Sequence, residues 1–185
     1  MAVALVLSVL AGAQTPKATA KKTAVHKANE LTLAGLRPGH DSKGHAIRLY
    51  GNKYRRAGNL ESQLVLIDEC KEQLLAIDTD TAQKIQVIRV GHVPFRADCV
   101  ETPPSPWKTG FGLRLDDPTA KIVRLYGPPD SKSPSSKGGQ QLELWYYAFD
   151  WAGPDVPQVM EVLCTAEEVG KPGRVVEITL AAPSL

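Results

Sequence analysis

The residues of this chain that could bind a metal ion are few and poorly spaced. His40, Asp41 and His45 lie close together in the sequence, but the spacing of the two histidines does not place their imidazoles on one face of a helix. Acidic pairs occur at 68–69 and 78–80, without the ligand spacing of a dedicated calcium loop. Aspartates of this kind suit turns. We therefore expect a solvated helix start and acidic turns, with no metal and no cofactor.

Arrangements for nucleophilic catalysis are also missing from the sequence. Residues 133–139 read SPSSKGG and lack the order of glycines and lysine that a phosphate-binding loop requires, so we expect a flexible loop there. The chain has no zinc-protease helix, no nucleophile elbow and no cysteine–histidine pair with an orienting partner. The sequence therefore predicts no catalytic residues.

A sheet face is the best candidate for function. Trp145 and Tyr147 alternate along an expected strand, and large, stiff aromatic side chains are enriched at binding hot spots. Carboxylates from this strand and from the two that follow flank them. The predicted partner-binding residues are Trp145, Tyr147, Glu143, Glu161 and Glu177. The alternative is that another part of the chain, such as the linker that holds Trp107, covers this face and makes it a second core.

Two segments of the chain have similar sequences, and each predicts a short helix that would support the sheet with the aromatic face. The tetrapeptide Arg-Leu-Tyr-Gly at 48–51 recurs at 124–127, and Asp41 is matched by Asp117 at the same offset. In each copy we expect a short helix with the aspartate as N-cap, an apolar stripe and a terminal glycine. Such helices are too short to be stable alone and must pack on other elements.

Strand patterns follow each expected helix. The expected strands are 62–68, 72–78 and 84–90 in the first half, and 141–150, 157–165 and 173–181 in the second. Alternation assigns Leu144 and Tyr146, with Met160 and Val162, to the core face. The expected fold class is α+β: two tandem units, each a short helix packed on a three-to-four-stranded antiparallel meander.

Composition and charge narrow the function classes. The chain has 185 residues, 43% of them hydrophobic and 23% charged, with a formal net charge of +2. This is typical of a soluble globular protein. A folded part near neutrality argues against a nucleic-acid binder, and no apolar run is long enough to span a bilayer.

The N-terminus indicates export. Residues 2–13 read AVALVLSVLAGA, an apolar run whose small residues fit signal-peptide cleavage after Ala13; a buried helix of a cytosolic fold is the alternative. The predicted organisation is a signal peptide at 1–13, a flexible tether at 14–30, a first unit at 31–92, a Pro-rich linker at 93–110 and a second unit at 111–185. The expected location is periplasmic or secreted.

The chain has three cysteines, Cys70, Cys99 and Cys164. Cys164 lies within an apolar strand pattern, where a buried thiol behaves as a small hydrophobe. Cys70 and Cys99 lie in polar surroundings, and our preferred disulfide joins them, although sequence alone does not fix the connectivity.

The second half of the chain resembles a known family. A capped short helix, Gly127-Pro128-Pro129, a Ser/Gly-rich loop and the strand LELWYY at 142–147 resemble the small outer-membrane assembly proteins of the BamE/SmpA type. Two such units in tandem resemble the architecture of the beta-lactamase inhibitor protein. The resemblance implies helices on one side of an antiparallel sheet, a binding face on the other, and no catalytic residues. The assembly proteins are lipoproteins, whereas this chain has Gln14 in place of the lipid-bearing cysteine.

The sequence therefore predicts an exported, soluble, non-catalytic module that binds or inhibits another envelope or secreted protein through a sheet face. One alternative is a hydrolase with an acidic site between the units, using Asp68 and Asp78. Another is a purely structural envelope component. Replacement of the two acids would abolish turnover in a hydrolase but leave partner capture by a binding module intact.

Overall fold

The computed structural model describes residues 29–51, 53–58, 60–93, 107–149, 158–167 and 170–182. It contains two short helices, α1 (Lys43–Tyr50) and α2 (Thr119–Tyr126), and a 3-10 turn at Glu69–Lys71. The expected signal peptide and most of the tether, as well as most of the Pro-rich linker, lie outside the described residues.

The repeated aspartates do not cap the helices in the expected way. Ser42 is the N-cap of α1, and its Oγ accepts from the backbone N–H of His45 at 3.3 Å. Instead, the Oδ2 atoms of Asp41 and Asp117 accept from the backbone N–H groups of Arg37 and Arg114, each at 2.7 Å. The two aspartates therefore fix the turn that leads into each helix, because their carboxylates point backwards along the chain.

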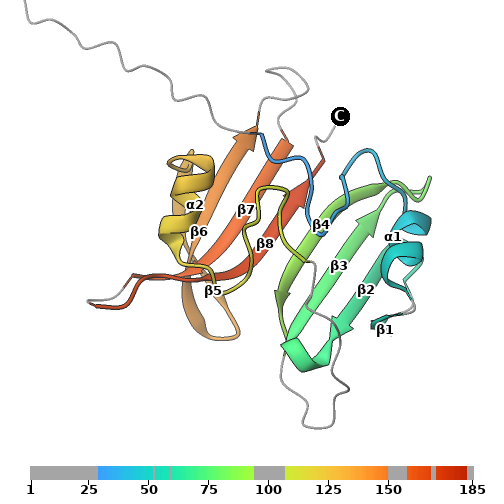
Figure 1. The fold of residues 1–185 in the computed structure, drawn as a ribbon, viewed down its shortest axis with the longest axis horizontal. Coiled ribbons are helices and arrows are strands. Elements are labelled where there is room, and N and C mark those ends of the chain that lie inside the picture. The colour runs from blue at the N-terminus through green and yellow to red at the C-terminus, as the bar shows by residue number, and fades with distance from the viewer. Residues whose placement is uncertain are drawn as a thin grey trace, which may run out of the picture.

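The eight strands formed by the described residues belong to one sheet. They are β1 (Arg55–Ala57), β2 (Gln63–Asp68), β3 (Gln73–Thr79), β4 (Ile85–His92), β5 (Ser131–Lys137), β6 (Gln140–Phe149), β7 (Gln158–Thr165) and β8 (Val175–Ala181). Their order across the sheet is β1-β2-β3-β4-β8-β7-β6-β5, and every pair is antiparallel. Figure 1 shows β4 and β8 meeting between α1 on one side and α2 on the other.

The predicted fold class, α+β with two tandem helix-plus-meander units, is wrong. The described residues are mostly sheet, with 50% strand and 15% helix, and their strands form one continuous antiparallel sheet. Strand β4, the last strand of the first meander, pairs with β8 from Val87–Ala181 to Gly91–Glu177. Each meander alone would leave that edge unpaired and would bury little apolar surface. When the two edges join, their backbone groups are paired and more apolar surface is buried.

Two strands were missing from the expected set. The segment that we expected to be a flexible loop, 133–139, forms most of β5, which pairs along β6 from Ser131–Tyr146 to Lys137–Gln140. The other missing strand, β1, has only three residues. Both are edge strands with mainly exposed side chains, so neither carries the hydrophobic alternation by which strands are recognised.

The hydrophobic core lies on one face of the sheet. Side chains in register across the strands, such as Leu75, Val90 and Ile178, belong to the same buried cluster. Ala46 and Tyr50 of α1 and Ile122 and Tyr126 of α2 join it. Both helices therefore pack on this face, and the opposite face contributes nothing to the core cluster.

Candidate functional site

The two aromatic residues predicted to bind a partner lie in the core. Trp145 is 3% exposed and Tyr147 is 0% exposed. They pair with Val162 and Met160 of β7, which are buried on the helix-covered face. The Tyr147 hydroxyl donates to the Gly127 carbonyl at 3.0 Å. The predicted face assignment of β6 is therefore inverted, and neither aromatic side chain is available to a partner.

The inversion has a simple physical cause. Strand β6 has large apolar residues on both of its faces, with Leu144 and Tyr146 on one and Trp145, Tyr147 and Phe149 on the other. Alternation finds such a strand but does not say which set faces the core, because a shift of one residue exchanges the faces. The signal that decides is the ring of Tyr126 from α2, whose centroid lies 5.9 Å from that of Tyr147 and 6.0 Å from that of Phe149.

The three predicted carboxylates do not lie together. Glu143 shares the helix-covered face with Trp145, and its Oε2 accepts from the indole Nε1 and from the ammonium group of Lys132. Glu161 and Glu177 lie on the opposite face, where they pair with Tyr146 and Leu163. The predicted acidic and aromatic surface is therefore divided between the two faces of the sheet.

The opposite side of the sheet, here called the open face, carries neither helix. Its half-buried apolar side chains include Ile67, Leu74, Val87, Leu144, Tyr146 and Leu163. Cross-strand register aligns Ile67 with Leu74, then Gly91, Glu177, Leu163 and Leu144 in one row. The open face therefore presents a mixed apolar and charged surface that runs across the central strands.

A charged cluster lies at the centre of the open face. The carboxylate of Glu177 contacts the Nε of Arg89 at 3.4 Å and the ammonium group of Lys137. A Cβ on Gly91 would meet Glu177 Oε2 at 3.1 Å and Lys137 Nζ at 3.4 Å. Because Lys137 ends β5, the tip of the β5–β6 hairpin reaches over the open face as far as the β4–β8 junction.

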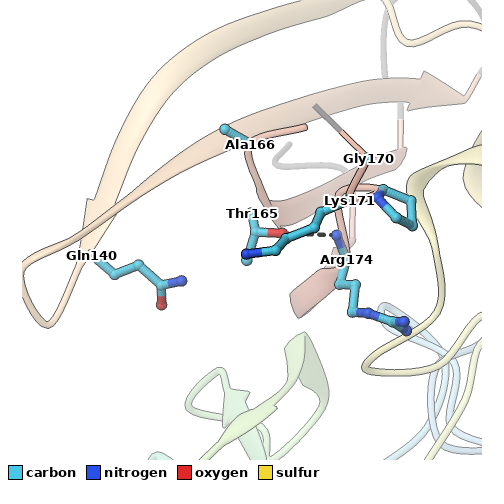
Figure 2. A pocket seen from close by; sticks show the side chains of 7 residues that line it. Gln140, Thr165, Ala166, Gly170, Lys171 and Arg174 are labelled. Carbon is cyan, nitrogen blue, oxygen red and sulfur yellow. Dashed lines mark hydrogen bonds between the residues drawn. The ribbon is translucent and has the colours of Figure 1, made fainter. Parts of the chain in front are cut away.

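A pocket of about 450 Å³ lies where the β5–β6 hairpin meets the β7–β8 connection. It is lined by Gln140, Thr165, Ala166, Gly170, Lys171, Pro172 and Arg174. Figure 2 shows the side chains of Gln140 and Lys171 extending toward one another below Thr165. Thr165 Oγ1 accepts from the backbone N–H of Arg174 at 2.9 Å, so the end of β7 is held to the segment that leads into β8.

The acids proposed for a hydrolase do not converge. Asp68 is 1% exposed, and its Oδ1 accepts from the backbone N–H of Lys71 at 3.3 Å. Asp78 lies at the other end of the β2–β3 pair, where its Oδ1 accepts from Gln63 Nε2 at 2.8 Å. The two carboxylates therefore lie at opposite ends of the ladder and on opposite faces of the sheet.

Two histidines near α1 contact the carboxylate of Asp41. Asp41 Oδ1 lies 3.2 Å from His45 Nδ1 and 3.4 Å from His40 Nδ1. Partial burial raises the pKa of Asp41, but the hydrogen bond from Arg37 N–H and the contacts with His45 and His40 outweigh it, so the pKa is lowered overall. Within the described part of the chain, no group of three or more His, Cys, Asp or Glu residues could hold a metal ion.

The cysteines have different states. Cys70 is disulfide-bonded, and Cys99 lies outside the described residues, so the pairing between them stays a prediction. Cys164 is free and buried. Burial, together with the nearby carboxylate of Glu143, raises the pKa of the Cys164 thiol to about 12. The thiol is therefore protonated at neutral pH and is not poised as a nucleophile.

Comparisons with known proteins show remote likenesses of shape. No protein-family model and no curated protein matches the chain. A protein of the DUF4309 family, YjgB from Bacillus subtilis, is 11% identical at a TM-score of 0.46, covering 85% of this chain and 88% of that one. A cysteine-rich secretory protein from Staphylococcus aureus is 11% identical at a TM-score of 0.36, and the match covers 77% of this chain and 44% of that one. Neither description names an enzymatic activity.

Among the residues that the structure describes, no helix is long and apolar enough to cross a membrane.

Proposed function

We propose that this chain is a non-catalytic binding or inhibitory module of the cell envelope or the secreted fraction, and that the open face takes its protein partner. One observation carries the proposal: both helices pack on one side of the sheet, and the other side retains half-buried apolar residues. An apolar surface rimmed by polar groups is typical of an interaction site. The resemblance to the BamE/SmpA type supports the same arrangement, with helices on one face of the sheet and a binding surface on the other.

The C-terminal part of the open face has the features of a binding surface. Leu144 and Tyr146 of β6 lie next to Leu163 and Glu161 of β7 in register. Tyrosine is enriched at binding hot spots, where its ring adds apolar area and its hydroxyl adds a hydrogen bond. We therefore expect Tyr146 and Leu163 to contribute most of the binding energy, in place of the buried Trp145.

The proposed partner is another envelope or secreted protein. The apolar start of the sequence, residues 2–13, supports export, and the disulfide at Cys70 fits an oxidising compartment. The proposal uses neither Asp68 nor Asp78, whose carboxylates lie at opposite ends of the β2–β3 ladder.

Partner capture from the envelope and secreted fraction of the source cell tests the proposal. The bait is the chain beginning at Gln14, compared with the double variant Tyr146→Ala, Leu163→Ala. The control is Phe111→Ala, Val123→Ala, which truncates two residues that are 48% and 43% exposed on the helix side. We expect the control to capture the partner as the parent does, and the open-face variant to lose at least tenfold in capture.

Circular dichroism and thermal unfolding of each bait establish that it is folded before capture is scored. Equal capture by the folded open-face variant and the parent would remove the open face from the proposal. Loss of capture in the helix-side variant alone would move the binding surface to the other side of the molecule.

A further inference from the structure

Two cations share one carboxylate at the centre of the open face. Glu177 Oε1 lies 3.4 Å from Arg89 Nε, and its Oε2 accepts from the ammonium group of Lys137. Gly91, which lies opposite Glu177 in the β4–β8 register, leaves room for this carboxylate, because a Cβ at that position would come within 3.1 Å of Oε2. The cluster therefore carries one more positive charge than negative charge.

The two cations of this cluster are exposed, and the acid lies beneath them. The side chains of Arg89 and Lys137 are 44% and 42% exposed, whereas that of Glu177 is 14% exposed. Within the described part of the chain, Arg89 donates one hydrogen bond, from Nε to Thr179 Oγ1 at 3.4 Å, so both of its Nη groups remain as donors. An approaching partner therefore meets the N–H groups of two cations before it meets the carboxylate.

Apolar side chains flank the cluster in the same row of the sheet. Leu74 lies opposite Gly91 on one side, and Leu163 lies opposite Glu177 on the other. Both leucines are half-buried, so each has apolar area left for a partner. A new ion pair that forms between such groups is shielded from water, and its attraction is stronger because the effective dielectric constant is lower.

The other acids of the open face are directed away from the two cations. Glu161 lies two strands from Arg89, in a row that passes through Thr179. Asp78 lies toward the far end of β3, where its Oδ1 accepts from Gln63 Nε2 at 2.8 Å. The positive charge at the centre of the face is therefore offset by direct contact with Glu177 alone among the described acids.

We propose that Arg89 and Lys137 together receive the carboxylate of an aspartate or glutamate side chain of the protein partner. This inference rests on the proposed function, because it names the chemistry of the segment that the open face takes. A guanidinium group binds a carboxylate through paired N–H donors, and both Nη groups of Arg89 remain for that contact. The partner segment therefore carries an acid between apolar side chains that pack on Leu74 and Leu163.

Selection of random peptides displayed on phage tests the proposal with a defined probe. The bait is again the chain beginning at Gln14, and the Kd of each selected peptide is measured after synthesis. We expect the selected peptides to carry Asp or Glu among apolar residues, and replacement of that acid by its amide to weaken binding roughly tenfold. Selection of peptides without an acid, or of no peptide, would overturn the inference.

Matched variants of the chain locate the contact. Arg89→Gln should weaken the binding of a selected acidic peptide roughly tenfold. Arg124→Gln makes the same change of charge at an exposed position on α2 and should leave binding unchanged. Glu177→Gln removes the carboxylate that shares the two cations, so it should tighten binding. Equal effects of the two arginine substitutions, or weaker binding in Glu177→Gln, would show that the cluster serves the fold rather than a partner.

The double variant Tyr146→Ala, Leu163→Ala separates failure of this inference from failure of the proposed function. Circular dichroism first establishes that each variant is folded. Binding that is lost in the double variant but kept in Arg89→Gln would retain the open face and overturn its preference for acids. Binding that is kept in the double variant would remove the open face itself as the binding surface.

Discussion

At the scale of the residue, the most constrained side chain is a buried carboxylate that sequence patterns did not single out. Glu30 is 1% exposed. Its Oε1 accepts from the N–H groups of Thr32 at 3.0 Å and Gly110 at 2.9 Å, and its Oε2 accepts from Phe111 N–H at 3.1 Å and from the Tyr126 hydroxyl at 2.7 Å. Four donors, three of them from residues far away in the chain, contact this carboxylate. Glu30 also contributes to the raised pKa of Tyr126, after burial.

Replacement of Glu30 tests whether these hydrogen bonds stabilise the fold. Glu30→Gln presents an amide NH₂ to groups that are themselves donors, so we expect the free energy of unfolding to fall by about 2 kcal/mol. Urea denaturation measures the loss. The control is Glu61→Gln, which removes an exposed carboxylate; an equal effect of the two substitutions would show that the buried network contributes nothing.

Asp41 makes the stability of the fold depend on pH in the acidic range. Its pKa is lowered in the folded state, so the ionised form stabilises the fold above the unfolded pKa of about 3.9, and this contribution disappears as the pH falls through the lower folded value. We therefore expect Asp41→Asn to be less stable than the parent at pH 6, with the difference shrinking toward zero between pH 4 and pH 2. Urea midpoints measured across that range check the prediction. If the difference in stability between the variant and the parent grew as the pH fell, the prediction would be contradicted.

At the scale of the element, the sequence predicted six strands to within two residues but did not identify β1 and β5. The six have alternating or continuous apolar residues, whereas β5 is polar along its length because only its backbone joins the sheet. Alternation also left the faces of β6 undecided, since both are apolar. Leu144 and Tyr146, which lie on the open face and belong to the binding surface that we propose, were therefore assigned to the core. A contact with Tyr126, which lies far away in the sequence, was the missing information.

The composition of β5 protects an exposed edge. Pro134 lies in the middle of this strand, opposite Glu143, and proline has no N–H with which to pair another strand. We expect Pro134→Val to increase self-association, seen as a larger species in size-exclusion chromatography with light scattering. Ser136→Val, on the same strand, keeps the proline and should behave as the parent. Equal behaviour of both variants would assign protection of the edge to the lysines instead.

At the scale of the whole molecule, one sheet and one core predict one cooperative transition. The repeated sequence around 48–51 and 124–127 suggested two units, but pairing of β4 with β8 and the shared cluster around Ile178 make the halves interdependent. Contacts of this kind join segments that are far apart in the chain, so local sequence patterns do not predict them. The sequence therefore predicted most strands but not how they assemble.

Unfolding in urea, followed by hydrogen exchange at amides of β3 and β7, measures this cooperativity. We expect both strands to report the same free energy of unfolding. Ile178→Ala removes a side chain that is 0% exposed at the junction and should lower both values together by roughly 2–5 kcal/mol. Separate values for β3 and β7, with only β7 responding to the substitution, would mean that the halves fold independently.

The measurement that tests the central claim most directly is site-specific photo-cross-linking from the open face. A photoreactive phenylalanine analogue replaces Tyr146 on the open face or Val123 on the exposed side of α2, and cross-linked products are compared in the envelope and secreted fractions. The account predicts one discrete protein adduct from position 146 and none from position 123. An adduct from position 123, with nothing captured from position 146, would contradict it.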